Sequence, residues 1–265
     1  MKQSTIIGGL GSLVLVTGAL VMSPQSVGAF FSLPGLLVVF GGTLLATLFS
    51  RPVAEVRSLW QKLPQLFREE ESTMDTDVEQ LLWFAHKHRL NGPRTMEAAL
   101  PQVTNPFLRD GLRQVIEGCS FDDLNKALQW RIAGMRSQES GQIQILYTMA
   151  AYAPAFGMLG TLFGLVHMLS GIGEAGLNEI GGSMAFAMIT TVYGIIASNL
   201  LFKPLAIKLE RRTGQRLMQL TALMEGILQI QERRHPTLIK EALESYRAHY
   251  QAPEPVGRPL TLVKA

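Results

Sequence analysis

Four long apolar stretches decide the fold class of this chain. They lie at residues 6–22, 30–48, 146–169 and 184–202, and none of them contains an Asp, Glu, Lys or Arg. A helix needs about 20 apolar residues to cross about 30 Å of hydrocarbon, and each stretch is close to that length. We therefore expect an all-α integral membrane protein with four transmembrane helices.

The distribution of basic residues predicts the topology. Lys and Arg are concentrated in residues 51–142 and from residue 203 onward, whereas the connectors 23–29 and 170–183 contain neither. Because cytoplasmic segments are enriched in Lys and Arg, both basic segments and both termini are expected in the cytoplasm. Cleavage of the first stretch as a secretory signal is an alternative, but it would leave the basic segment on the wrong side of the membrane.

Helical spacing of apolar residues continues outside the four stretches and predicts the domain organisation. We expect a transmembrane hairpin at 1–50, a cytoplasmic helical insert at 51–142 and a second hairpin at 143–202. Cytoplasmic C-terminal helices are expected at 203–250. The proline-rich end, 251–265, is expected to be a flexible tail.

Local signals predict where the cytoplasmic helices begin and end. Three helix-start patterns are Thr76 with Glu79, Asn105 before Pro106, and Ser120 with Asp123. The third pattern leads into the apolar stretch 146–169 without a Gly-Pro stop. It therefore predicts one long helix that runs from the cytoplasm into the bilayer. His235 and Pro236 are expected to interrupt the C-terminal helical stripe.

The third apolar stretch has two interpretations. Pro154 lacks a backbone N–H, which frees a carbonyl and predicts a hinge, and Gly157, Gly160 and Gly164 have the spacing that lets helices approach closely. In one interpretation this is only a tightly packed helix, with the Thr161 hydroxyl bonded to its own backbone. In the other, the helix lines an ion path.

Hydroxyl groups support the second interpretation. Thr161, Thr190, Thr191 and Tyr193 place hydroxyls inside apolar stretches that contain no carboxylate. Hydroxyl and carbonyl oxygens are the ligands that a partly dehydrated cation requires. None of these groups carries a proton alone at neutral pH, so any titratable ion carrier has to come from another chain.

Other ionisable residues near the membrane allow weaker alternatives. His167 titrates in a useful range but falls near the outer end of its stretch, where an interfacial imidazole is unremarkable. Glu174 and Glu179 either concentrate cations at a mouth or belong to a solvated connector.

The sequence gives no sign of soluble catalysis or nucleic-acid binding. It contains no phosphate-binding loop of the GxxxxGK(S/T) type, no HExxH, no CxxC and no GxSxG motif. Membrane sidedness explains the basic segments, and acidic residues are interleaved with them. We therefore expect neither an enzyme nor a resident cofactor, metal or nucleic-acid partner.

Four motifs resemble those of one family. They are APAFGMLGTLFGLV at 153–166, ITTVYG at 189–194, FKPLA at 202–206 and NPFLRDGL at 105–112. Together with the four-span order and the large insert, they resemble the MotA/PomA stator family within the MotA/TolQ/ExbB group of ion-driven motors. The resemblance extends over about residues 8–230.

Membership would imply a particular assembly in the bacterial inner membrane. The chain would form a homo-oligomer, typically a pentamer in contact with membrane lipid, around two copies of a MotB/PomB-like partner. That partner has a single span with an ion-carrying Asp and a peptidoglycan-binding domain. The ring would turn as sodium ions or protons load and leave the partner's Asp, and it would drive a FliG-like cytoplasmic rotor protein.

The resemblance also implies residue roles. Pro154 and Pro204 fall on the family's two important prolines and, with Gly160, are the expected hinge and coupling positions. Thr161, Thr190 and Thr191 fall on hydroxyl positions linked to the ion path in sodium-driven members, which favours sodium over protons.

The insert departs from the family pattern where the rotor is expected to bind. The expected rotor-facing residues are Lys87, Arg89, Arg94 and Glu97, which keep a basic-then-acidic order without the usual glycine-leucine stretch between them. This departure leaves the identity of the rotor open. Two other functions are alternatives to a flagellar stator. One is a TolQ/ExbB-like energiser of an outer-membrane process, and the other is a passive membrane scaffold.

Overall fold

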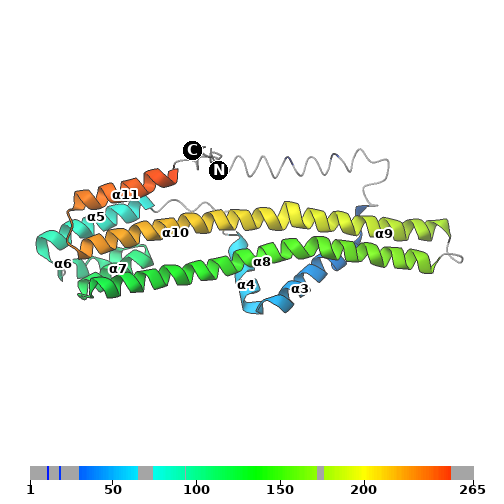
Figure 1. Ribbon diagram of the computed structural model, residues 1–265, viewed down its shortest axis with the longest axis horizontal. Coiled ribbons are helices and arrows are strands. Elements are labelled where there is room, and N and C mark those ends of the chain that lie inside the picture. Colours follow the sequence, from blue (N-terminus) through cyan, green and yellow to red (C-terminus); the bar gives the residue numbers. More distant parts are fainter. Residues whose placement is uncertain are drawn as a thin grey trace, which may run out of the picture. The chain divides into compact units, whose positions relative to one another are not determined.

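The structure, a computed structural model, describes residues 11, 18, 30–64, 74–92, 94–171 and 176–251, and these residues form helices without strands. The first elements are α2 (Leu33–Leu36), the π-helix η2 (Leu37–Gly41), α3 (Gly42–Ser50), α4 (Val53–Lys62), α5 (Met74–Asn91), α6 (Arg94–Glu97) and the 3₁₀-helix η4 (Leu100–Gln102). They are followed by α7 (Pro106–Ile116), α8 (Phe121–Ser170), α9 (Leu177–Ile196), the π-helix η5 (Ala197–Phe202), α10 (Lys203–Gln231) and α11 (Pro236–Gln251) (Figure 1). The all-helical prediction is confirmed for this part of the chain.

Three helical runs in the described residues are long and apolar enough to cross a membrane. They are Leu33–Ser50, Phe121–Ser170 and Glu179–Gln231, and they contain the second, third and fourth expected stretches or most of them. The first expected stretch, 6–22, lies outside the described residues apart from two glycines. Four spans therefore remain a prediction, whereas three helices of suitable length and composition are observed.

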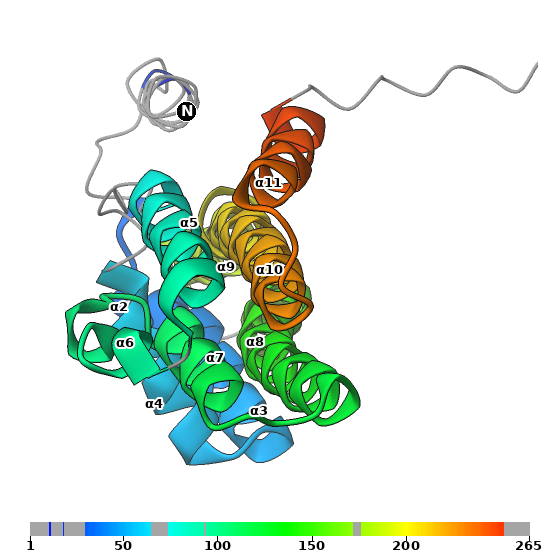
Figure 2. The ribbon, with the colours of Figure 1, turned by 90° about the vertical axis from the view of Figure 1, so that its left-hand side faces the viewer.

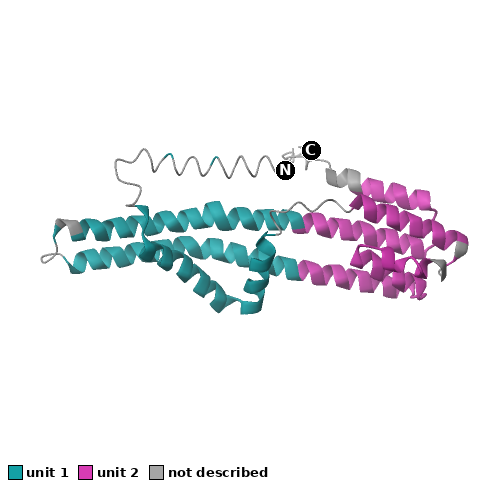
Figure 3. Cartoon of the chain, turned by 180° about the vertical axis from the view of Figure 1, so that it is seen from behind, with its two compact units in different colours: residues 1–69, 138–212 teal, residues 70–137, 213–265 magenta. Residues whose placement is uncertain are grey.

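The chain divides into two compact units, each assembled from segments far apart in the sequence (Figure 3). Unit 1 comprises residues 1–69 and 138–212, and unit 2 comprises residues 70–137 and 213–265. The residues of unit 1 therefore include all four apolar stretches, and unit 2 contains most of the insert and of the C-terminal helices.

Unit 1 is organised around the antiparallel pair formed by the second part of α8 and α9 (Figure 1). The first part of the run from α2 to α3 packs against α9, and α4 follows after a turn at Arg51 and Pro52. Residues of α4 share an apolar core with α8, η5 and the beginning of α10. Its buried members include Val56, Leu59, Ile145, Leu146, Met149, Ala153, Phe202 and Leu209.

Unit 2 is a helical cluster in which α5, α7, α10 and α11 share one apolar core with the beginning of α8 (Figure 2). Its fully buried members include Leu81, Leu108, Leu112, Leu124, Leu128, Leu223, Ile227 and Ile239. Two glycines let helices approach here. A Cβ at Gly111 would lie 2.6 Å from Ile227 Cδ1, and one at Gly226 would lie 2.7 Å from Leu81 Cδ1.

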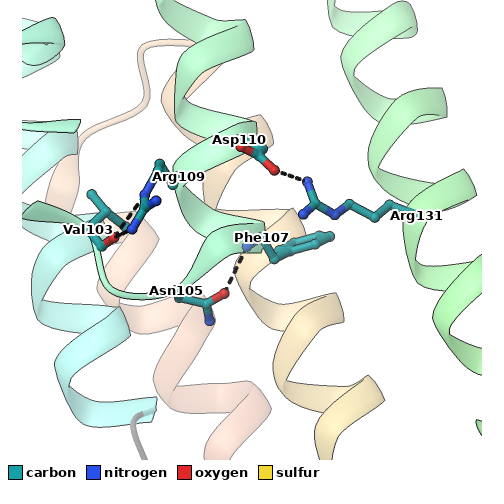
Figure 4. A network of polar contacts seen from close by, with 6 residues as sticks. All are labelled: Val103, Asn105, Phe107, Arg109, Asp110 and Arg131. Carbon is teal, nitrogen blue, oxygen red and sulfur yellow. Dashed lines mark hydrogen bonds and ion pairs between the residues drawn. The ribbon is translucent and has the colours of Figure 1, made fainter. Parts of the chain in front are cut away.

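The start of α7 follows the sequence prediction. Asn105 Oδ1 accepts a hydrogen bond from the Phe107 N–H at 3.0 Å, so Asn105 caps the helix that Pro106 begins (Figure 4). The Arg109 side chain donates to the Val103 carbonyl, and Arg131 on α8 pairs with Asp110. These contacts hold α7 to the preceding loop and to α8.

Two further boundaries agree with the sequence prediction, and one differs. The Asp123 N–H donates to Ser120 Oγ at 3.2 Å, and α8 then runs unbroken for 50 residues, as predicted. The helix α10 ends before His235, and α11 begins at Pro236. By contrast, α5 already includes Thr76, so the cap predicted there is wrong.

Candidate functional site

The helices α8 and α9 pack closely because small residues face each other. A Cβ at Gly160 would lie 2.6 Å from Thr190 Cβ, and one at Gly164 would lie 2.7 Å from Ala187 Cβ. Real Cβ atoms are not found so close, so these positions have to be glycine for the helices to meet as they do. The predicted close approach along this face is therefore observed.

Thr190 lies inside this contact. Its side chain is 0% exposed, and its hydroxyl donates to the Ala187 carbonyl at 2.8 Å. Its methyl group also lies 3.2 Å from where a Cβ at Gly35 would be, so α2, α8 and α9 enclose it. In this arrangement Thr190 contacts its own chain on all sides, and helix packing accounts for its presence.

Thr161 and Thr191 are only half-buried. The Thr161 hydroxyl donates to the Met158 carbonyl at 2.5 Å, which uses its proton and leaves its oxygen lone pairs available. The Thr191 hydroxyl makes no hydrogen bond with any part of the chain that the structure describes. Of the three predicted threonines, these two can therefore contact a group outside the chain.

Tyr193 fastens the beginning of α2 to α9. Its hydroxyl donates to the Phe30 carbonyl at 2.6 Å and accepts from the Ser32 N–H at 2.9 Å. Ser32 in turn caps α2, because its side-chain oxygen accepts from the Gly35 N–H. These bonds give Tyr193 an anchoring role that sequence reasoning, which grouped it with the ion path, did not identify.

Pro154 lies within α8, and the helix continues through it. A proline lacks the N–H that would bond the carbonyl four residues earlier, which here belongs to Ala150. The Ser198 hydroxyl in η5 donates to this carbonyl at 2.7 Å, and both residues are buried. The freed carbonyl predicted from the sequence is thus already bonded, by a residue that the sequence analysis did not select.

Pro204 follows the π-helix η5 and is exposed in the first turn of α10. At the end of η5 the Lys203 N–H bonds the Ser198 carbonyl, five residues earlier. The chain therefore passes from α9 into α10 through a wider turn, without a break. A proline and a π-helix occur together here, at an expected coupling position.

The expected rotor-facing residues all belong to α5 and α6 in unit 2. Lys87 and Arg89 lie near the end of α5, and Arg94 and Glu97 are the first and last residues of α6. Arg89 and Glu97 are exposed, whereas Lys87 Nζ lies 5.4 Å from the centre of the Trp83 ring. The structure therefore places these residues in neighbouring elements.

The remaining ionisable candidates give no defined site. His167 is exposed near the end of α8, Glu179 is exposed in the first turn of α9, and Glu174 lies outside the described residues. No group of three or more His, Cys, Asp or Glu side chains in the described part of the chain could hold a metal ion.

Sequence comparisons identify relatives along almost the whole chain. The family model for the MotA/TolQ/ExbB proton channel family matches residues 99–222. Motility protein A of Borreliella burgdorferi is 29% identical over 249 residues, which cover 93% of this chain and 94% of the relative. Chemotaxis protein PomA of Vibrio alginolyticus is 29% identical over 246 residues, covering 93% and 95%.

Solved structures show the same fold. A chain of the C. jejuni MotAB structure superposes with a TM-score of 0.84 at 20% identity, over 93% of this chain and 96% of that one. A chain of the flagellar MotAB stator complex from Bacillus subtilis gives a TM-score of 0.81 at 24% identity, over 95% and 100%. Motifs, relatives and fold thus agree in one similarity: over most of its length the chain resembles proteins of the MotA/TolQ/ExbB proton channel family, among them proteins named motility protein A and PomA.

Proposed function

We propose that this chain is the channel subunit of an ion-driven flagellar stator, which couples cation flux across the inner membrane to torque. The observation that carries the proposal is the closely packed α8–α9 pair, whose apolar stretches contain hydroxyls but no carboxylate. Relatives named for motility match 93% of the chain, and this supports a flagellar role over a TolQ/ExbB-like energiser.

A division of labour follows from the missing carboxylate. This chain supplies an uncharged wall, and a MotB/PomB-like partner with a single span supplies the Asp that binds and releases the ion. A carboxylate inside a membrane is costly and is retained where it has a function, so an intramembrane Asp on the partner would mark the position that carries the ion. We propose a homopentamer around a partner dimer, which a peptidoglycan-binding domain would anchor.

Sodium is the ion that we favour over the proton. The oxygens of Thr161 and Thr191 are hard ligands that could replace part of the hydration shell of a cation as it reaches the partner's Asp. Thr190 would act differently, because its buried side chain holds α8 and α9 together. We therefore propose that Thr161 and Thr191, but not Thr190, contact the ion.

Torque would be delivered through charged residues of unit 2. Arg89 on α5 and Glu97 on α6 are exposed and Lys87 on α5 is half-buried, so charges of both signs are accessible on these two helices. A FliG-like rotor protein with complementary charges could bind such a surface rapidly and release it, since exposed charge pairs favour fast association more than tight binding.

Reconstitution in lipid vesicles tests the proposal. The chain and its partner are reconstituted together, and flux is measured under a sodium gradient or a proton gradient. We expect flux that requires the partner's Asp and is lost when that Asp is replaced by Asn. Equal flux through this chain alone, or flux that is unchanged after the Asp replacement, would contradict the division of labour.

A further inference from the structure

The hydroxyl of Ser198 forms a different kind of contact from the other helical hydroxyls of unit 1. Most of them donate to a carbonyl of their own helix, three or four residues earlier, which satisfies the group locally. These residues are Thr43, Thr47, Ser50, Ser58, Thr148, Thr161, Ser170, Ser183 and Thr190. Ser198 instead donates to Ala150, on another helix, across 48 residues of sequence.

The acceptor is the carbonyl that Pro154 leaves without its helical partner. Ala150 is 2% exposed and Ser198 is 1% exposed, so water cannot reach this carbonyl easily. An unpaired backbone carbonyl is costly in an apolar interior. The Ser198 hydroxyl therefore takes the place of the N–H that Pro154 lacks.

The backbone around Ser198 allows α9 and η5 to come close to the proline turn. A Cβ at Gly194 would lie 2.7 Å from the Ala153 carbonyl oxygen and 3.1 Å from Pro154 Cα, so the glycine lets α9 approach the proline turn. Ser198 follows one turn later, in the π-helix η5. Such single wide turns often occur at functional sites.

We propose that Ser198 is a positioning residue that holds the proline turn of α8 against η5. Its hydrogen bond selects one arrangement of the two helices. Any hinge movement at Pro154 that accompanies ion passage has to break this bond and then remake it. The link to ion passage rests on the proposed function, whereas the link between Ser198 and Pro154 stands on the contact itself.

A double-mutant cycle tests the contact, using the purified complex with its partner. Ser198→Ala leaves the Ala150 carbonyl unpaired, and we expect the midpoint of thermal unfolding to fall by roughly 3–6 °C. Pro154→Ala restores an N–H to that carbonyl, so in this background Ser198→Ala should cost less than half as much. Equal costs in the two backgrounds would overturn the proposal.

Two further variants separate this contact from a general loss of packing. Ser183→Ala removes a hydroxyl of α9 that bonds its own helix, and its effect should be the same with or without Pro154. Ser198→Thr keeps the donor and should recover most of the stability that Ser198→Ala loses. Failure of Ser198→Thr to recover it, together with additive costs in the cycle, would show that only side-chain volume matters.

Flux measurements test the link to ion passage. With a movable proline turn, Ser198→Ala should change the maximal flux by about fivefold while the half-saturating ion concentration changes less than twofold. Unchanged maximal flux would remove the role in ion passage and leave the contact structural. If the unsubstituted complex conducts no ions, the proposed function fails, and the thermal cycle still decides whether Ser198 serves Pro154.

Discussion

The Tyr193 hydroxyl on α9 and the Phe30 carbonyl before α2 are joined by a 2.6 Å hydrogen bond across 163 residues of sequence. The same hydroxyl accepts from the Ser32 N–H, so it satisfies a donor and an acceptor at the beginning of a helix. Helix starts leave backbone N–H groups without intrahelical partners, and the phenol supplies one of these partners. Tyr193 thereby connects the expected second and fourth spans.

Tyr193→Phe keeps the ring and removes both hydrogen bonds. We expect a loss of about 1–3 kcal/mol in stability, because a partly buried carbonyl and an N–H lose their partner together. The dependence of flux on sodium should stay unchanged, since the hydroxyl is already occupied within the chain. Thermal unfolding measures the loss of stability, and flux through the reconstituted complex measures the dependence on sodium. If Tyr193→Phe alters the ion dependence of flux but not the stability, Tyr193 contributes to the ion path and does not anchor α2.

Thr190 and Thr191 are adjacent but should respond differently to substitution. Thr190→Val keeps the shape of a side chain whose hydroxyl bonds only its own helix, so ion dependence should be retained. Thr191→Val removes a half-buried hydroxyl that is free within the described chain, and it should weaken the response to sodium. Flux measured against sodium concentration distinguishes the two. A stronger effect at Thr190 would show that it leaves its packed position during transport.

Gly160 and Gly141 provide a matched pair on α8. Gly160→Ala would place its Cβ 2.6 Å from Thr190 Cβ, and we expect a loss of about 1–3 kcal/mol because the two helices must separate. Nothing lies within 4 Å of a Cβ at Gly141, so Gly141→Ala should be neutral or stabilising by about 0.5–1 kcal/mol. Thermal unfolding of each variant is the measurement. Equal effects at both positions would contradict the observed packing of α8 on α9.

Much of the fold could be predicted because its signals are local. The cap at Asn105, the break before Pro236 and the uninterrupted run from Ser120 each depend on residues within one or two turns. Long uncharged stretches likewise identify membrane helices one at a time. Such signals establish where helices form but not which helices meet.

The contacts of the site could be predicted only in part, because they join distant residues. The glycine spacing predicted a close helix contact, but the buried position of Thr190 depends on Gly160 and Gly35, which belong to two other helices. The bond from Ser198 depends on a π-helix, which gives no clear sequence signal. Ser198 could have been selected as a partner for the carbonyl that Pro154 frees. That selection requires knowing which helix lies against the proline turn.

His88 makes the stability of unit 2 depend on pH. Burial, and then the positive charge of Arg233, lower the pKa of this imidazole below its ordinary value of about 6.5. Above that value the imidazole is neutral in both the folded and the unfolded chain. As the pH falls below it, the unfolded chain binds the proton first, so stability is lost.

Substitutions of His88 and of Arg233 test whether stability falls as the pH falls. We expect the free energy of unfolding to decrease as the pH falls from about 7 through the lowered pKa, and His88→Gln should reduce this slope. Arg233→Asn removes the nearby charge and should reduce the slope in part, while asparagine tolerates the positive φ of 56° at this position. Chemical unfolding of the complex, followed by a probe in unit 2 at several pH values, gives the slope. A stability that rises on acidification, and does so only when His88 is present, would mean that the imidazole gains a negatively charged neighbour instead.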